Sequence, residues 1–172
     1  EVERERRFTF PAVNARSNRV ADALRGLGVQ KGDRVALLLM NGVEFVESFF
    51  AIAKIGAIVV PLNWRLVADE LAFMLGDSGA TVLIYDHELG AVVTDLQSRG
   101  PAGTAVRDWL EVGPAERRAA FARGYDETVR VVRAACVVGV VRVARVARIV
   151  RRPPVMGRGG RGVRPPHRQP AD

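Results

Sequence analysis

Three short runs of apolar residues constrain the fold of this chain more than any other feature. They are VALLLM at residues 35–40, AIVVPLN at residues 57–63 and TVLIYD at residues 81–86. A strand that is buried on both faces of a parallel sheet has this continuous apolar character, whereas a strand with one solvent-exposed face alternates apolar and polar residues. The runs therefore predict three buried strands.

Segments with the apolar spacing of helices separate these runs. The first follows Thr9, a residue type that caps helices well, and ends at the glycines of residues 26 and 28. The second, residues 41–56, carries a broad apolar stripe of Phe45, Val46, Phe49, Phe50 and Ala53. The third covers residues 67–75 and stops at the sequence GDSG. Alternating strands and helices of this kind predict an α/β fold with a parallel sheet and right-handed crossovers.

The pattern weakens after Asp86 but continues. Residues 88–99 are expected to form a helix, residues 104–112 an extended segment and residues 115–128 a further helix.

The order of these segments resembles the start of the AMP-forming acyl-CoA synthetases, a family of adenylate-forming ligases. The resemblance rests on GVQKGDRVALLLMN, EFVESFFAIAKIGAIVVPLNWRL and ELAFMLGDSGATVLI, all within residues 8–84. A fainter likeness continues through VRDWLEVG and FARGYDET, so that residues 1–127 are interpreted as the N-terminal portion of the family's synthetase domain.

The resemblance implies a two-step reaction in fatty acid metabolism. A carboxylate attacks the α-phosphate of ATP, and the thiol of coenzyme A then displaces AMP from the acyl-adenylate. The intact family enzyme is thus expected to use ATP, Mg²⁺ and coenzyme A together with a small-molecule carboxylic acid, whose identity this part of the sequence does not reveal.

The family's catalytic motifs have no counterpart in this sequence. They are a Ser/Thr/Gly-rich phosphate loop that ends in Pro-Lys-Gly, a later Thr-Glu pair, a ribose-binding Asp and a C-terminal lysine. MGRGGRGVRPPHRQ, at residues 156–169, stands where the loop is expected, yet it contains no Ser, Thr or Lys. No catalytic, cofactor-binding or metal-binding residue is therefore assigned. The chain is expected to hold no cofactor and to be inactive alone.

Other candidate sites have simpler structural interpretations. GDSG resembles the nucleophile motif of chymotrypsin-like proteases, but both histidines, His87 and His167, follow Ser78. A mostly parallel sheet is also not the scaffold of those proteases. The motif is interpreted as a helix stop and a turn. DHE, residues 86–88, follows a strand where α/β proteins bind ligands, but it has no second His or Cys nearby. It is interpreted as a solvated loop.

Four further segments or residues are candidates for binding or reactive groups. PLNWR, residues 61–65, could line a pocket or a subunit contact through Trp64 and Arg65, although packing in a surface loop is preferred. Lys31 is placed in a turn, and Lys54 is expected to reach solvent from the edge of a helix. Cys136 is interpreted as a buried or incidental thiol.

The composition changes abruptly at residue 128. Residues 1–127 carry 15 Lys and Arg against 18 Asp and Glu, whereas residues 128–172 carry 11 Arg against a single Asp. The net charge of +7 therefore originates entirely in this second part. It is rich in Val, Arg, Ala, Gly and Pro and contains no Leu, Lys, Phe, Tyr, Trp, Ser or Asn.

Two interpretations of residues 128–172 remain. A GC-rich coding region read in another frame yields this composition, which favours a frameshift near Val129. The alternative is a disordered basic arm, with Arg142, Arg145, Arg148 and Arg151 at every third position, that makes the chain a binding module for nucleic acid or an anionic surface. No aromatic residue lies among these arginines, so only unspecific charge attraction is expected.

Composition also limits the compartment and the behaviour in solution. A single cysteine and no visible secretory signal favour the cytoplasm, and the longest apolar stretch, residues 49–62, is interrupted by Lys54 and too short to span a bilayer. The oligomeric state cannot be read from the sequence. An incomplete sheet is expected to leave an unpaired edge and an uncovered apolar face, and therefore to lower solubility.

Overall fold

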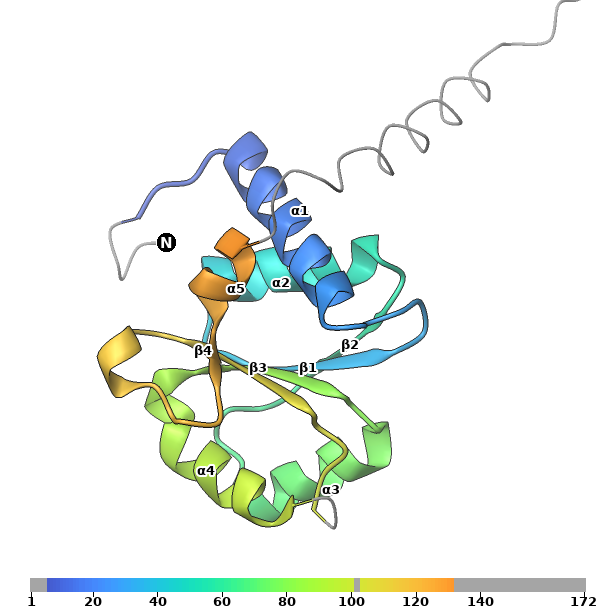
Figure 1. Cartoon of the computed structure of the whole chain (residues 1–172), viewed down its shortest axis with the longest axis vertical. Helices are drawn as coiled ribbons and strands as arrows, with labels where there is room; N and C mark the ends of the chain where they lie inside the picture. The colour runs from blue at the N-terminus through green and yellow to red at the C-terminus, as the bar shows by residue number, and fades with distance from the viewer. Residues whose placement is uncertain (1–5, 101–102, 132–172) are drawn as a thin grey trace, which may run out of the picture. The chain divides into compact units, whose positions relative to one another are not determined.

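A five-stranded parallel sheet forms the centre of the computed structural model, which describes residues 6–100 and 103–131 (Figure 1). The strand order is β2-β1-β3-β4-β5. The strands are β1 (Arg34–Leu38), β2 (Ile58–Pro61), β3 (Val82–Asp86), β4 (Asp108–Val112) and β5 (Arg123–Gly124). The α/β class and the parallel sheet expected from the sequence are confirmed.

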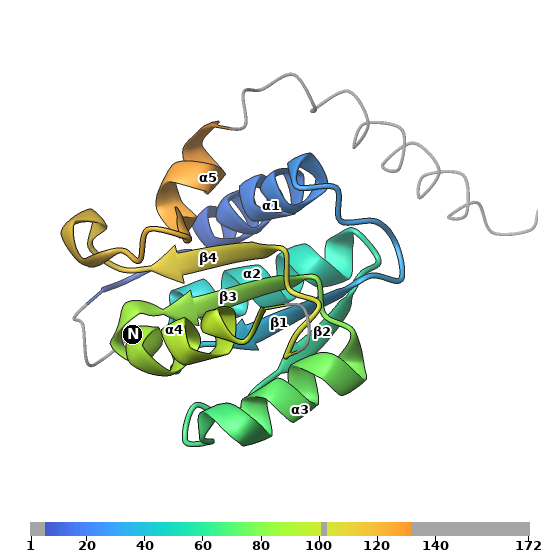
Figure 2. The ribbon, with the colours of Figure 1, turned by 60° about the horizontal axis from the view of Figure 1, so that its bottom comes forward.

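Helices cover both faces of this sheet (Figure 2). One layer consists of α1 (Phe10–Gly26), α2 (Val43–Lys54) and α5 (Tyr125–Val131), and the other of α3 (Ala68–Ser78) and α4 (Gly90–Ser98). Every residue of β3 is buried, as are the last four of β1. The expectation of an uncovered apolar sheet face is therefore wrong, because helices on both sides exclude water from the central strands.

Local sequence signals explain where the first helix begins and where the third helix ends. The Thr9 hydroxyl accepts a hydrogen bond from the amide of Ala12 at 3.3 Å, as a residue at the N-cap should. Helix α3 extends three residues beyond the expected end, to Ser78, and Gly79 terminates it in the left-handed conformation with φ 63°. A glycine adopts this conformation without the Cβ clash of other residues.

The apolar stripe of α2 lies on the outer side of the helix. Val46, Phe49 and Phe50 are 41%, 43% and 52% exposed. The opposite side, which faces the core, carries Val43, Glu44, Glu47, Ser48, Ala51 and Ile52. The helix thus buries two carboxylates and a hydroxyl while it exposes aromatic rings.

Two further expectations are corrected by the structure. Residues 57–63 do not form a buried strand, because β2 lies at the edge of the sheet, where Ile58 is 48% exposed. Residues 115–128 do not form one helix. They comprise the 3₁₀ turn Ala115–Arg117, a loop, the two-residue β5 and the start of α5.

The segments between β3 and β4 follow the sequence pattern more closely. A 3₁₀ turn at His87–Leu89 leads into α4, and β4 occupies the second half of the extended segment expected at residues 104–112. The expected boundary between residues 127 and 128 falls inside α5, whose Val129 is buried in the core.

Candidate functional site

The carboxyl ends of β1 and β3 are where a sheet of this topology places ligands. The strand order reverses here, since β1 is flanked by β2 on one side and β3 on the other. In this structure Asp86, at the end of β3, accepts a hydrogen bond through Oδ2 from the backbone amide of Met40, just beyond β1. Asp86 is 6% exposed. The carboxylate thus joins the two strand ends instead of facing an open crevice.

The DHE tripeptide is divided between the protein interior and solvent. Asp86 is buried, whereas Glu88 is exposed. The His87 side chain packs against the backbone of Gly113, where an added Cβ would lie 2.6 Å from the His87 Cβ, Cγ and Nδ1 atoms. Within residues 6–100 and 103–131, no group of three His, Cys, Asp or Glu side chains is arranged to hold a metal ion. The prediction of a solvated loop holds for Glu88 but is wrong for Asp86.

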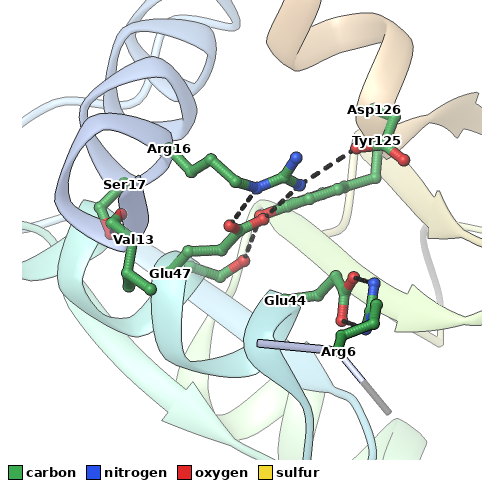
Figure 3. Close-up of polar contacts among 9 residues, drawn as sticks. Arg6, Val13, Arg16, Ser17, Glu44, Glu47, Tyr125 and Asp126 are labelled. Carbon is green, nitrogen blue, oxygen red and sulfur yellow. Dashed lines mark hydrogen bonds and ion pairs between the residues drawn. The ribbon is translucent and has the colours of Figure 1, made fainter. Parts of the chain in front are cut away.

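A buried polar network at Glu47 joins the three helices of one layer (Figure 3). Arg16 of α1 donates two hydrogen bonds to the Glu47 carboxylate, through Nε to Oε2 and through Nη2 to Oε1, the latter at 2.8 Å. Tyr125, the first residue of α5, donates its hydroxyl proton to Glu47 Oε1 at 2.8 Å. Glu47 itself is inaccessible to solvent.

Two further residues extend this Glu47 network. Because the single hydroxyl proton of Tyr125 is directed to Glu47, the hydroxyl of Ser48, 3.0 Å away, acts as donor to the Tyr125 oxygen. Arg16 Nη2 also reaches Asp126 Oδ1 at 3.2 Å. The hydrogen bonds from Ser48 through Tyr125 end on the Glu47 carboxylate, which is paired with Arg16. This arrangement holds the three helices in place and leaves none of these hydroxyls activated as a nucleophile.

A second buried pair lies on the other face of the sheet. Tyr85 of β3 donates its hydroxyl proton to Glu111 Oε2 of β4 at 2.6 Å, and the amide of Ala119 donates to the same oxygen at 3.2 Å. Among the described residues, Glu111 Oε1 and Arg118 Nε are buried without a hydrogen-bond partner. The Arg118 guanidinium lies against the backbone of Gly124 and pairs with Glu127 at 2.7 Å.

The electrostatics of both sites keep their tyrosines neutral. Burial raises the pKa of Tyr85, and its hydrogen bond to Glu111 raises it further. Burial likewise raises the pKa of Tyr125, with a further contribution from the charge of Glu47. The hydrogen bond to Glu47 raises the pKa of Arg16. Neither phenol is therefore available as a phenolate base at neutral pH.

The two lysines and the GDSG serine have structural partners. Lys54 Nζ donates to Asn14 Oδ1 at 2.6 Å and to Asn18 Oδ1 at 2.8 Å, and desolvation lowers its pKa. The stem of Lys31 packs against Gly56. The Ser78 hydroxyl donates to the carbonyl oxygen of Leu75 at 3.3 Å. Since Ser78 precedes β3 and His87 follows it, the length of that strand separates the two residues, and they form no catalytic pair.

The PLNWR segment forms a packed surface loop, as expected. The Arg65 guanidinium lies 4.9 Å from the centre of the Trp64 ring, and the Arg65 amide donates to Asn63 Oδ1 at 3.0 Å. Leu62, which precedes them in the segment, is buried. His167, Cys136, the four evenly spaced arginines and residues 156–169 lie outside the described residues.

Two shallow grooves lie at the amino end of the sheet, opposite the expected ligand edge. One, of about 580 Å³, is lined by Phe73, Asp77 and Arg99, and the other, of about 360 Å³, by Gln97, Arg107 and Trp109. The Arg99 guanidinium is already paired with Asp69 at 2.7 Å and Asp95 at 2.9 Å. Neither groove presents a group of converging polar side chains that would select a ligand.

The residues of both buried networks were not identified from the sequence. Their one local signal is an acidic residue inside an otherwise apolar segment, as with Glu47 in VEFVESFFAIAK and Glu111 in DWLEV. Such a residue needs a partner if it is buried. The partners Arg16 and Tyr125 are 31 and 78 residues away from Glu47, so the local sequence does not reveal them.

Comparison with known proteins gives a consistent result. Residues 2–134 match the family described as AMP-binding enzyme. The long-chain-fatty-acid–CoA ligase FadD13 of Mycobacterium tuberculosis is 45% identical over 104 residues, which cover 60% of this chain and 21% of that ligase. The chain thus spans about a fifth of the length of the curated relatives it matches, in their N-terminal part.

Solved structures give the same relationship. The Mycobacterium tuberculosis fatty acyl CoA synthetase superposes with a TM-score of 0.66 at 38% sequence identity, over 76% of this chain and 24% of that one. The anthranilate CoA ligase AuaEII, solved with anthranoyl-AMP, gives a TM-score of 0.68 at 32% identity, over 73% of this chain and 23% of that one.

Proposed function

Because the chain belongs to the family of AMP-binding enzymes, we propose that its sheet is the N-terminal scaffold of an AMP-forming acid–thiol ligase. Such a ligase activates a carboxylic acid as an acyl-adenylate and passes the acyl group to coenzyme A. One observation carries this proposal: the stretch that matches the family, residues 2–134, includes all five parallel strands. The relatives act by name on acids as different as long-chain fatty acids and anthranilate, so this region does not define the acid.

The described residues do not fit ATP or Mg²⁺. Two buried carboxylates are already engaged, Asp86 by the Met40 amide and Glu47 by Arg16 and Tyr125. Both lysines serve structural contacts. We derive no catalytic step through these groups. The described residues contribute a parallel sheet in which Asp86 is hydrogen-bonded to the Met40 amide across the switch point.

We further propose that the chain alone has no adenylation activity. ATP–pyrophosphate exchange with the purified chain should not rise above background with any acid, while the intact Mycobacterium tuberculosis synthetase assayed alongside should give a clear signal. Exchange that requires both the acid and this chain would refute the proposal.

We propose that the intact ligase acts in the cytoplasm, a compartment that suits a chain with one cysteine. No helix among the described residues has the length and apolar character needed to cross a bilayer.

A change of reading frame near Val129 is our explanation for residues 128–172. The match to the family ends at residue 134, and the composition changes at nearly the same place. The test is to sequence the coding DNA from Gly124 onward and translate all three frames. Another frame should continue into a Ser/Thr/Gly-rich loop that ends in Pro-Lys-Gly. If no frame does, the frameshift is excluded, and the basic arm becomes the hypothesis to test by salt-dependent retention on heparin.

A further inference from the structure

Lys54, the last residue of α2, holds its amine against two side-chain amides of α1. Its Nζ donates to Asn14 Oδ1 at 2.6 Å and to Asn18 Oδ1 at 2.8 Å, and the residue is exposed. We propose that Lys54 is an acylation site, whose Nζ accepts the acyl group of a thioester such as an acyl-CoA. This inference goes beyond the proposed function, since the reaction requires neither ATP nor the motifs of the family.

The hydrogen-bond partners of the Lys54 amine are uncharged. Among the residues that the structure describes, no carboxylate forms an ion pair with it. A carboxylate beside a lysine holds the group as ammonium, which has no lone pair and therefore cannot attack a carbonyl carbon. Here desolvation lowers the pKa of Lys54, so that a larger fraction of the amine is neutral than for a fully hydrated lysine.

The two asparagines also orient the neutral amine. A neutral amine has two N–H bonds and one lone pair. When the two N–H bonds point to the Oδ1 atoms of Asn14 and Asn18, the tetrahedral geometry of nitrogen directs the lone pair away from both side chains. Because Lys54 is exposed, an acyl donor reaches that side from solvent. The arrangement thus presents a nucleophile of the kind that amine acylation requires.

The proposed reaction is an aminolysis of the thioester. The lone pair of Nζ attacks the carbonyl carbon, the C–N bond forms and the C–S bond breaks. Coenzyme A leaves as a thiolate, which takes up the proton that the amine loses. The product is an uncharged amide with a single N–H, so it can donate to only one of the two asparagines. Acylation therefore removes one hydrogen bond between α1 and α2.

The chain contains an internal control, because Lys31 is its only other lysine and is also exposed. The Lys31 amine has no hydrogen bond or ion pair within the described part of the chain. Full-length protein would be incubated with acetyl-CoA, unfolded, and treated with deuterated acetic anhydride to block the remaining amines. Trypsin then cuts only after arginine and leaves Lys31 in peptide 26–34 and Lys54 in peptide 35–65.

The fraction of each peptide with an unlabelled acetyl group measures acylation of the folded chain. Lys54 should be acylated at least about threefold faster than Lys31, since the neutral fraction of an amine changes tenfold for each unit of pKa. In concentrated urea the two rates should become equal. An excess at Lys54 that persists in urea would trace its reactivity to the neighbouring sequence instead of to the contact with α1, and would overturn the proposal.

Charges placed at the two asparagines test the role of the uncharged partners. Asn14→Asp/Asn18→Asp preserves the shape of both side chains but surrounds the amine with carboxylates, which raise its pKa. Acylation of Lys54 should therefore fall about tenfold or more. Asn41→Asp/Gln97→Glu adds the same charge at exposed positions, one before the first turn of α2 and one on α4, and should leave the Lys54 rate unchanged.

The Lys31 rate, measured in the same molecules, shows whether either double variant has altered the chain as a whole. A Lys54 rate no higher than that of Lys31 in the wild type would overturn the proposal. An equal response of Lys54 to the two double variants would also overturn it. The family assignment would stand in every case, because it rests on the sequence match and not on Lys54.

Discussion

Both helical layers pack on the sheet through apolar side chains, but they differ in the buried polar groups that join their helices. Under α1, α2 and α5, a charge-paired carboxylate at Glu47 joins all three helices through directional hydrogen bonds. Under α3 and α4, packing is largely apolar, through Leu71, Leu75, Val93 and Leu96. Directional hydrogen bonds fix which side of a helix faces inward, whereas apolar contacts stabilise any side of the helix whose shape fits the sheet. The hydrogen bonds to Glu47 explain how α2 holds Phe49 and Phe50 outward.

The largest expected effect on stability concerns the layer of α1, α2 and α5. Arg16→Met leaves the Glu47 carboxylate buried with Tyr125 as its remaining side-chain donor, and the free energy of unfolding should fall by about 4 kcal/mol. Urea denaturation of the full-length chain measures this value. Asp126→Asn, which removes only the exposed end of the network, should cost about 0.5 kcal/mol. Equal losses for the two variants would contradict a central role for the Arg16–Glu47 pair.

The layer of α3 and α4 should lose stability when a substitution leaves a cavity in it. Leu75→Ala removes a fully buried side chain of α3 and should lower the free energy of unfolding by about 3 kcal/mol. The neighbouring Met74 is only partly buried, so Met74→Ala should cost about 1 kcal/mol. The same urea series compares both. If Met74→Ala proved the more damaging, the packing of α3 would differ from that described.

The two buried tyrosines sharpen the comparison at the level of single hydrogen bonds. Tyr85→Phe leaves Glu111 with the Ala119 amide as its one remaining hydrogen-bond donor among the described residues, and it should cost about 2 kcal/mol. Tyr125→Phe should cost about 1 kcal/mol, because Arg16 still satisfies Glu47 through two bonds. The reverse order in denaturation experiments would show that Glu111 has a stronger partner than Tyr85.

The smallest effect is spectroscopic and concerns alkaline pH. The chain contains two tyrosines, and the pKa of each is raised above the ordinary value near 10 in the folded state. A raised folded pKa contributes stability that is present below the unfolded value and is lost as the pH rises above it. The folded chain should therefore show no tyrosinate absorbance near pH 10, while the chain in concentrated urea should titrate there. Titration of either tyrosine near pH 10 without unfolding would contradict its burial.

Sequence patterns predicted the elements whose signal is local. The apolar runs at residues 35–40 and 81–86 became β1 and β3, since a continuous apolar run between polar segments needs burial on both faces. Residues 57–63 failed as a buried strand because an edge position depends on strand order, which no local pattern encodes. Residues 115–128 failed as one helix because the backbone of Gly124 pairs with Glu111 of β4.

The sequence by itself determined the family, the α/β class and the parallel sheet, because these follow from periodicity and from a motif order spread over residues 8–84. Only the tertiary structure decided which side of α2 faces the core. That choice depends on Arg16 and Tyr125, which lie far from Glu47 along the chain and meet it only when the three helices pack. A carboxylate cannot be buried without such partners. Phe49 and Phe50 therefore point outward although their apolar character alone would place them inside.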